Sequence, residues 1–186
     1  LEASHAYTGS DGTPYYPVVQ VVLTNGAVIS ATYPIVVRPK TLDVEMKVAI
    51  DEGLWYLHKI QTRYDVDANN KGGYWTYSAW NTFHINVTAS AVQAFGINGH
   101  VMTDDAARDP YVETVQRGVN YLLSRLTTIG VGPQPYGDPD GNQNGIGLTS
   151  PDGRPPYEVG PVMDAFVAAG RPELVAAVGG PNVVGR

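Results

Sequence analysis

The 186-residue chain is long enough for one ordinary domain, or for a small module joined to part of a larger one, and its 43% of apolar residues suffice for a core. Its net charge of -6, without any cluster of Lys or Arg, argues against nucleic acid and anionic membranes as partners, and no apolar run is long enough for membrane insertion. The sequence contains no cysteine, which excludes disulfides, thiolate catalysis and thiolate metal sites.

Two runs rich in β-branched and aromatic residues lie between Tyr15 and Val37, with Asn25-Gly26 between them. Asn-Gly between such runs is a strong hairpin signal. We therefore expect a β-hairpin, and because two strands alone are not stable in water, it needs a partner surface in this chain or in another.

The N-terminal segment also contains a set of residues that is similar to a known domain family. It combines His5-Ala6-Tyr7-Thr8 and the closing Ile35-Val36-Val37 with these residues: Gly12, Tyr16, Val18, Val21, Leu23 and Gly26. This set resembles the last strands of a PKD-type or related immunoglobulin-like domain. The resemblance implies that residues 1–38 are β-strands from the second half of such a module. It also implies an extracellular or cell-surface location, since these domains are common in microbial surface proteins.

A helix is predicted over about residues 43–63, capped by Thr41 or Asp43 after a short connector. Its apolar residues recur at helical spacing and define one buried stripe, made up of Ile50, Leu54, Leu57, Ile60 and Gln61. A loop is expected from Gln61 to Trp75. It returns Trp75 to the helix end, where the Gln61 amide reaches loop backbone or the indole, and Gly73 permits close approach.

Six residues of this segment form a recognisable set: Gly53, Trp55, Leu57, Gln61, Gly73 and Trp75. Together they resemble the Q-W repeat, of squalene-cyclase type, of the terpenoid cyclase and prenyltransferase superfamily. The fold implied is an α/α toroid of paired inner and outer helices. In that family the glutamine and tryptophan tie a helix end to the following loop, which implies a stabilising role for Gln61, Gly73 and Trp75.

Three further helices are predicted over about residues 86–98, 110–127 and 158–170, with a short one at 172–178. The first of these is apolar on most sides and is expected to be an inner helix. Gly118 follows Gly53 by 65 positions and Phe166 follows Phe95 by 71, which indicates a repeated helical hairpin. The second copy has Leu126 in place of the glutamine, and Tyr136-Gly137 comes nearest to the closing tryptophan.

The predicted fold class is mainly α with a small β part: residues 1–38 form the β-strands, and residues 39–186 form two helical hairpins of an incomplete α/α toroid. The resemblance implies that a closed ring has about six such hairpins, because each buries its face on its neighbours. The open edges therefore need neighbouring domains of a longer chain or a second copy, and a homo-oligomer is the expected partner arrangement.

A possible cation loop follows the third helix. Asp138, Asp140, Asn142 and Asn144 place oxygen side chains at every second position before Gly145, as a calcium loop does. The twelfth position counted from Asp140 is Pro151 where a bidentate glutamate is usual, and such residues also form ordinary turns. Calcium and a plain structured loop both remain open. No cofactor is required, and calcium is the one candidate.

The aromatic residues Trp55, Tyr74, Tyr77 and Trp80 lie close together in the sequence and can line a groove for a sugar or an apolar chain, or can belong to the core. The four histidines are dispersed, and no motif for nucleophilic catalysis occurs, so no catalytic residue is assigned. Asp104-Asp105 is interpreted as helix-start acids, and Asn86-Val87-Thr88 as a sequon without modification.

These observations predict a non-catalytic extracellular structural or assembly protein of a microbe that self-associates through its β-hairpin and open helical edges. One alternative is a fragment of a terpenoid-cyclase-like toroid enzyme or a domain that binds isoprenoid or polysaccharide. Another is a calcium-dependent adhesion module, which rests on the Asp138 to Asn144 loop alone.

Overall fold

The computed structural model describes residues 5–32, 34–67, 71–76, 84–141, 143, 145–150 and 155–170. The chain divides into two compact units, Leu1–Glu52 and Gly53–Arg186. The division falls inside the first helix, whereas the sequence analysis placed it between residues 38 and 39. The first half of that helix belongs to the same unit as the N-terminal strands, and residues 44 and 48 line grooves together with residues of the preceding segment.

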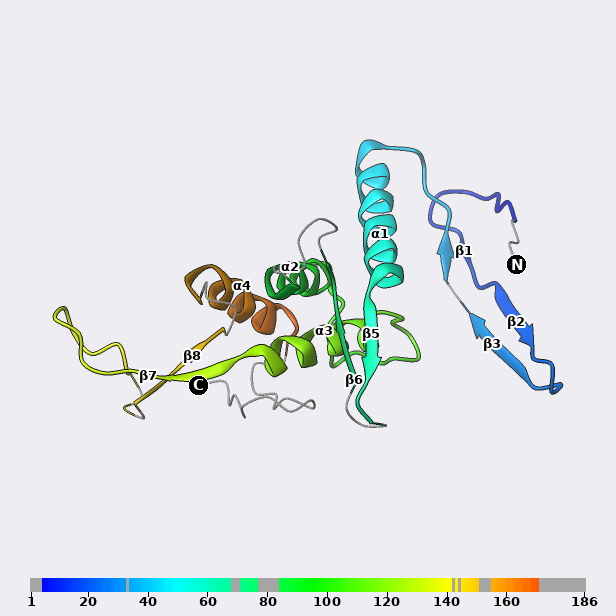
Figure 1. The fold of residues 1–186 in the computed structure, drawn as a ribbon. Helices are drawn as coiled ribbons and strands as arrows, with labels where there is room; N and C mark the ends of the chain where they lie inside the picture. Colours follow the sequence, from blue (N-terminus) through cyan, green and yellow to red (C-terminus); the bar gives the residue numbers. More distant parts are fainter. Residues whose placement is uncertain are drawn as a thin grey trace. The chain divides into compact units, whose positions relative to one another are not determined.

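The first unit contains two antiparallel strand pairs, which lie at the blue end of the chain in Figure 1. Strands β1 (Pro14–Tyr15) and β4 (Ile35–Val36) form one pair, and β2 (Val18–Val22) and β3 (Val28–Thr32) form the other. The turn between β2 and β3 uses Gly26 at a φ of +81°, and the Ala27 amide donates to the Asn25 Oδ1 at 3.0 Å. The hairpin predicted from Asn25-Gly26 is confirmed.

Four helices and four strands follow. Their bounds are α1 (Leu42–Ile60), β5 (Thr62–Asp65), β6 (Lys71–Tyr74), α2 (His84–Ile97), α3 (Val112–Arg125), β7 (Thr127–Gly130), β8 (Ile146–Thr149) and α4 (Pro155–Ala168). The four helices predicted over these regions are confirmed, with ends shifted by up to three residues. The third ends early because Leu126 turns to an extended conformation, with φ of -79° and ψ of 142°. The helix predicted at 172–178 lies outside the described residues.

Two hairpins replace segments that were expected to be loops. Strands β5 and β6 pair antiparallel with Thr62 opposite Tyr74, and β7 and β8 pair with Thr127 opposite Thr149. The short strands lack the alternation of apolar and polar residues that identifies a half-buried strand in a sequence. With four helices and four small strand pairs, the described part of the chain is a mixed structure of helix and strand, and it has more strand than predicted.

The core of the second unit surrounds α2. Ile85, Val92 and Phe95 are fully buried, and α2 packs against α3, α4 and β6 (Figure 1). At Gly96 the neighbouring α4 approaches so closely that a Cβ atom would lie 2.3 Å from the carbonyl oxygen of Ala168. The apolar composition that predicted a central helix thus corresponds to burial on several sides.

The buried stripe of α1 is shorter than the periodicity predicted. Leu54 is buried and Leu57 packs against the core from a half-buried position, whereas Ile50 and Ile60 are 43% and 44% exposed. Gln61, one residue beyond the helix, completes the buried set. The covering surface comes from Trp75 and α3, which contact α1 at its C-terminal end.

Candidate functional site

Trp75 closes the first helical hairpin from inside the core. Its indole Nε1 donates a hydrogen bond to the carbonyl oxygen of Leu57 at 2.8 Å, and its main-chain amide donates to the Thr88 hydroxyl at 3.2 Å. Its ring centroid lies 6.2 Å from that of Phe95. Because the last carbonyls of a helix have no partner within it, the indole satisfies one of them and ties α1 to the residue after β6.

Gln61 joins this hairpin to the next one. Its Nε2 donates to the carbonyl oxygen of Thr114 in α3 at 2.9 Å, and its Oε1 accepts from Arg63 Nε at 3.0 Å. The sequence analysis expected loop backbone or the indole as its partner, and α3 provides it instead. A Cβ atom at Gly73 would lie 2.7 Å from Gln61 Cδ and 3.1 Å from Arg117 Cβ. The three residues Gln61, Gly73 and Trp75 therefore surround one junction.

Arg117 is the main residue of this junction that the sequence analysis missed. Its Nη1 donates to the carbonyl oxygens of Tyr64 and Gly72 at 3.1 and 3.2 Å and to Asp65 Oδ1 at 2.7 Å. Its Nε donates to Glu113 Oε1 at 2.9 Å. The guanidinium thereby holds both strands of the β5–β6 hairpin against α3. The available signal was an arginine in the middle of the helix, on the face that also carries Thr114 and Tyr121.

Neighbouring carboxylates stabilise the positive charge of Arg117, although its side chain is buried. Burial by itself lowers the pKa of the guanidinium, but hydrogen bonds and charge from Asp65 and Glu113 outweigh that effect and raise the pKa above its usual value. Asp65, Asp67, Asn69 and Asn70 place four oxygen-bearing side chains close together in the sequence, an arrangement that can hold a cation but more often forms a solvated loop. Asp65 instead pairs with Arg117, and residues 69 and 70 lie outside the described part of the chain.

His58 lies beside this network and is half-buried. Its Nδ1 is 2.6 Å from the Thr114 hydroxyl and 3.2 Å from Arg63 Nη2, which also donates to the same hydroxyl at 3.0 Å. Since Arg63 can only donate, Nδ1 acts as an acceptor. Burial, followed by the charge of Arg63, lowers the pKa of His58. Thr114 is fully buried, so this hydroxyl–imidazole pair is not an accessible nucleophile.

The two helix–hairpin–helix repeats correspond in register. The pairs Thr62–Tyr74 and Thr127–Thr149 occupy the same place in their hairpins, and the connection is residues 66–70 in the first and 131–145 in the second. Leu126 accordingly replaces Gln61, and Ser150 replaces Trp75. Tyr136-Gly137 was predicted to stand in the place of Trp75, but Tyr136 is fully exposed in the longer connection. The hydroxyl group of the buried Ser150 donates a hydrogen bond to Oε2 of the buried Glu158 side chain.

The candidate cation loop shows only part of its ligand set. Asp138 Oδ1 accepts from the Asp140 amide at 3.0 Å, and Asp140 Oδ2 accepts from the Gly145 amide at 2.6 Å. These carboxylates stabilise a turn, as aspartates commonly do. Asn142 and Asn144 lie outside the described residues, and within the described ranges no three His, Cys, Asp or Glu side chains gather where a metal ion could bind. Calcium binding stays a prediction.

The candidate aromatic groove is likewise seen in part. Trp55 stacks on His58 with a centroid distance of 5.1 Å and is 47% exposed, whereas Tyr74 stacks on Tyr121 at 5.1 Å in a second cluster. Tyr77 and Trp80 lie outside the described residues. The two aromatic side chains that are described thus have separate ring partners.

The structure also places two smaller expectations and shows one pair that was not expected. Asp104 Oδ2 and Asp105 Oδ1 accept from the amides of Val101 and Ala107, so they stabilise turns well before α3 begins. Thr88 of the sequon is fully buried inside α2. One carboxylate–imidazole pair was not expected: His100 Nδ1 lies 3.0 Å from Asp109 Oδ2, which ties the α2–α3 connection to the start of α3.

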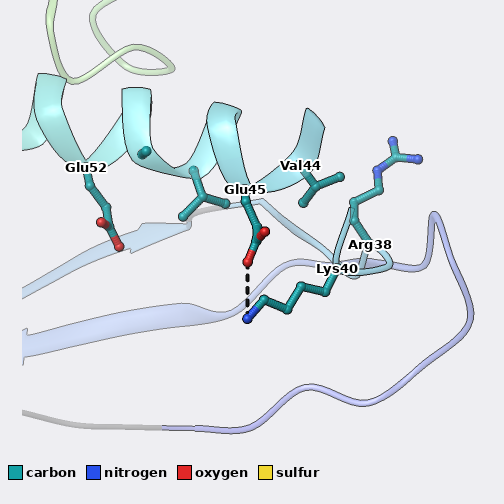
Figure 2. A pocket seen from close by; sticks show the side chains of 7 residues that line it. Arg38, Lys40, Val44, Glu45 and Glu52 are labelled. Carbon is teal, nitrogen blue, oxygen red and sulfur yellow. Dashed lines mark ion pairs between the residues drawn. The ribbon is translucent and has the colours of Figure 1, made fainter. Parts of the chain in front are cut away.

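The first unit contains an open groove of about 440 Å³. Figure 2 shows Lys40, from the connector, reaching across to Glu45 of α1, with Arg38 and Val44 nearby. The Lys40 Nζ and Glu45 Oε1 atoms are 3.1 Å apart. Glu52 lies two turns further along the helix. The Lys40 and Glu45 side chains are 85% and 52% exposed, and such surface ion pairs contribute little stability. The groove therefore has mixed charge and no buried polar group among the residues drawn.

None of the helices in the described ranges combines the length and the apolar character that a membrane span requires. Comparison of the chain with known protein families, with curated proteins and with solved structures found no match. The hydrogen bonds of Gln61, Trp75 and Arg117 define a junction between two helix–hairpin–helix repeats. Its polar atoms are used to hold the repeats together.

Proposed function

We propose that this chain is a non-catalytic structural or assembly protein that associates with copies of itself. The single observation that carries the proposal is the β2–β3 hairpin of the first unit. All ten residues of its two strands are exposed, and its six large apolar side chains are 48–69% exposed: Val18, Val19, Val21, Val22, Val28 and Ile29.

Exposed hairpins of this kind are association surfaces for two physical reasons. A two-stranded sheet leaves its outer backbone donors and acceptors unpaired, and these can add a further strand. Soluble monomers also rarely expose large contiguous apolar surfaces. Covering such a surface is favourable by about 25 cal/mol of free energy for each Å² removed from water. Covering both faces of this hairpin by other copies satisfies both requirements.

The extracellular or cell-surface location belongs to the same proposal and rests on the PKD-like pattern of residues 5–37 in the sequence. We further propose that the helical part is an open segment of an α/α toroid. This is supported by the repeated order of helix, hairpin and helix, together with the Gln61, Gly73 and Trp75 junction. An open segment leaves both of its end surfaces available for association.

The test is light scattering of the full 186-residue chain over a range of concentrations, with electron microscopy of the same sample. The informative variant replaces the cross-strand pair Val21 and Ile29 by Val21→Lys together with Ile29→Glu. Opposite charges across the strands keep the hairpin paired while removing apolar surface. We expect multimers for the parent chain, and about a tenfold or larger rise in the dissociation constant for the variant.

A matched control reverses the exposed ion pair of Asp43 and Lys47 in the same unit, as Asp43→Lys with Lys47→Asp. Both double variants leave the net charge unchanged, so a difference in association between them cannot come from a change in net charge. The control should assemble like the parent. A parent chain that remains a folded monomer at all accessible concentrations would sink the proposal.

A further inference from the structure

The junction inside the chain shows how one repeat accepts the next. The helix α3 lies on the first repeat at Gly118, where a Cβ atom would be 2.6 Å from Val92 Cγ2 and 3.2 Å from the Trp75 ring. Two residues further on, Asn120 Nδ2 donates to the Lys71 carbonyl oxygen of β6 at 2.8 Å. The next residue, Tyr121, stacks on Tyr74. The close approach depends on the missing side chain at 118.

The same helix positions in the first repeat are uncovered. Gly53 corresponds to Gly118, 65 positions earlier, and a Cβ atom there would meet nothing within 4 Å. Trp55 and Tyr56, which correspond to Asn120 and Tyr121, are 47% and 59% exposed. A glycine inside a helix lowers the stability of that helix, and among the residues that the structure describes no packing contact offsets this at Gly53. Gly53 could therefore accept a closely packed neighbour, as Gly118 does, but no described residue lies against it.

The opposite end of the second unit carries the matching uncovered surface. Met163 of α4 follows Val92 by 71 positions, the offset that relates Phe166 to Phe95, and it is 43% exposed where Val92 is fully buried. Ile129 of β7 corresponds to Tyr64 of β5 and is 52% exposed. Val92 and Tyr64, which lie beside α3 in the first repeat, thus have exposed apolar counterparts in the second, whereas Trp75 corresponds to the buried Ser150.

We infer that α1 of one copy, at Gly53, Trp55 and Tyr56, docks on Ile129 and Met163 of a second copy. This inference rests on the proposed self-association and names its contact. A second copy is the occupant because each chain carries one surface of each kind, both are apolar, and the contact between them is already formed once within the chain. The contact is head-to-tail, so successive copies build a ring or an open filament.

The absence of cysteine permits a direct test by cross-linking. Tyr56→Cys and Met163→Cys are made in separate full-length chains and treated with a short bismaleimide, alone and as an equimolar mixture. We expect covalent dimers in the mixture only, because each cysteine faces the unmodified position when its own variant is alone. Dimers that form equally well within either single variant would overturn the head-to-tail contact.

A second test substitutes Gly53 itself. Gly53→Leu should fold normally, since the space around residue 53 is empty, yet weaken association at least tenfold by holding the two copies apart. Assembly as tight as that of the parent would contradict the inference. If multimers persist without mixed dimers, and only the Val21→Lys and Ile29→Glu variant dissociates them, this contact is wrong and the proposed function stands. A monomeric parent overturns both.

Discussion

The side-chain amide of Gln61 donates a hydrogen bond of 2.9 Å to the main-chain carbonyl oxygen of Thr114, 53 residues further along the chain. This bond is buried and joins the end of α1 to the third helix. It makes the stability of one helical hairpin depend on the position of the next. The stability measurements proposed for this junction use protein concentrations low enough for association to contribute nothing.

Gln61→Ala should lower the free energy of unfolding by about 1–3 kcal/mol, because the Thr114 carbonyl is left buried without its donor. Urea denaturation followed by circular dichroism measures the change. Gln134→Ala is the control, since the Gln134 side chain is exposed and donates to the nearby Gly132 carbonyl at 3.1 Å. A Gln61→Ala chain as stable as the control would show that the bond contributes nothing net.

The two repeat-related glycines should respond in opposite directions to alanine. Gly118→Ala places a methyl group 2.6 Å from Val92 Cγ2, and the resulting overpacking should cost about 1–3 kcal/mol. Gly53→Ala meets open space and should stabilise the chain by about 0.5–1 kcal/mol through helix propensity. Thermal unfolding of the two variants side by side measures the difference. Equal shifts for both would contradict the packing described at Gly118.

Arg117→Met should cost about 2–4 kcal/mol, because the carbonyl oxygens of Tyr64 and Gly72 lose a charged donor. The loss is moderated because the side chains of Asp65 and Glu113 are about half exposed and regain water. Denaturant unfolding measures the cost. Arg108→Met is the control, since the Arg108 side chain forms an exposed ion pair with Asp105 and its loss should change stability by less than about 0.5 kcal/mol.

His58 should make stability fall as the solution becomes acidic. Its pKa is lowered in the folded chain from the ordinary value of 6.5, so below about pH 6.5 the unfolded chain binds more protons than the folded one. Its contribution is complete above that pH and is lost as the pH falls toward the folded pKa. His58→Gln should flatten this part of the stability profile, measured by urea midpoints at several pH values. An unchanged slope would exclude His58 as its source.

Much of the local structure was accessible from the sequence because its signals are local. Asn25-Gly26 between β-branched runs predicts the β2–β3 hairpin, and apolar periodicity predicts the four helices to within three residues. The set of Gln61, Gly73 and Trp75 also predicted that a helix end and the following segment meet. In each case the residues that interact lie within one element or one short connection.

The remaining features depend on contacts between distant segments. The β5–β6 hairpin contains Gly72 and Gly73 and lacks strand periodicity, and Arg117, about 50 positions away in α3, provides the donors that hold it. The equivalence of Ser150 with Trp75 was hidden because the second connection, residues 131–145, is longer than the first. No local pattern encodes either feature.

The sequence by itself determined the β2–β3 hairpin, the four helices and the repetition of a helical pair, because turn chemistry and apolar spacing act over a few residues. Only the tertiary structure decided which polar groups are partners and which surfaces stay open. Gly53 and Gly118 occupy the same helix position, yet one faces open space and the other contacts Val92 and Trp75. That difference comes from the burial of each helix against its neighbours, which two identical residues cannot reveal.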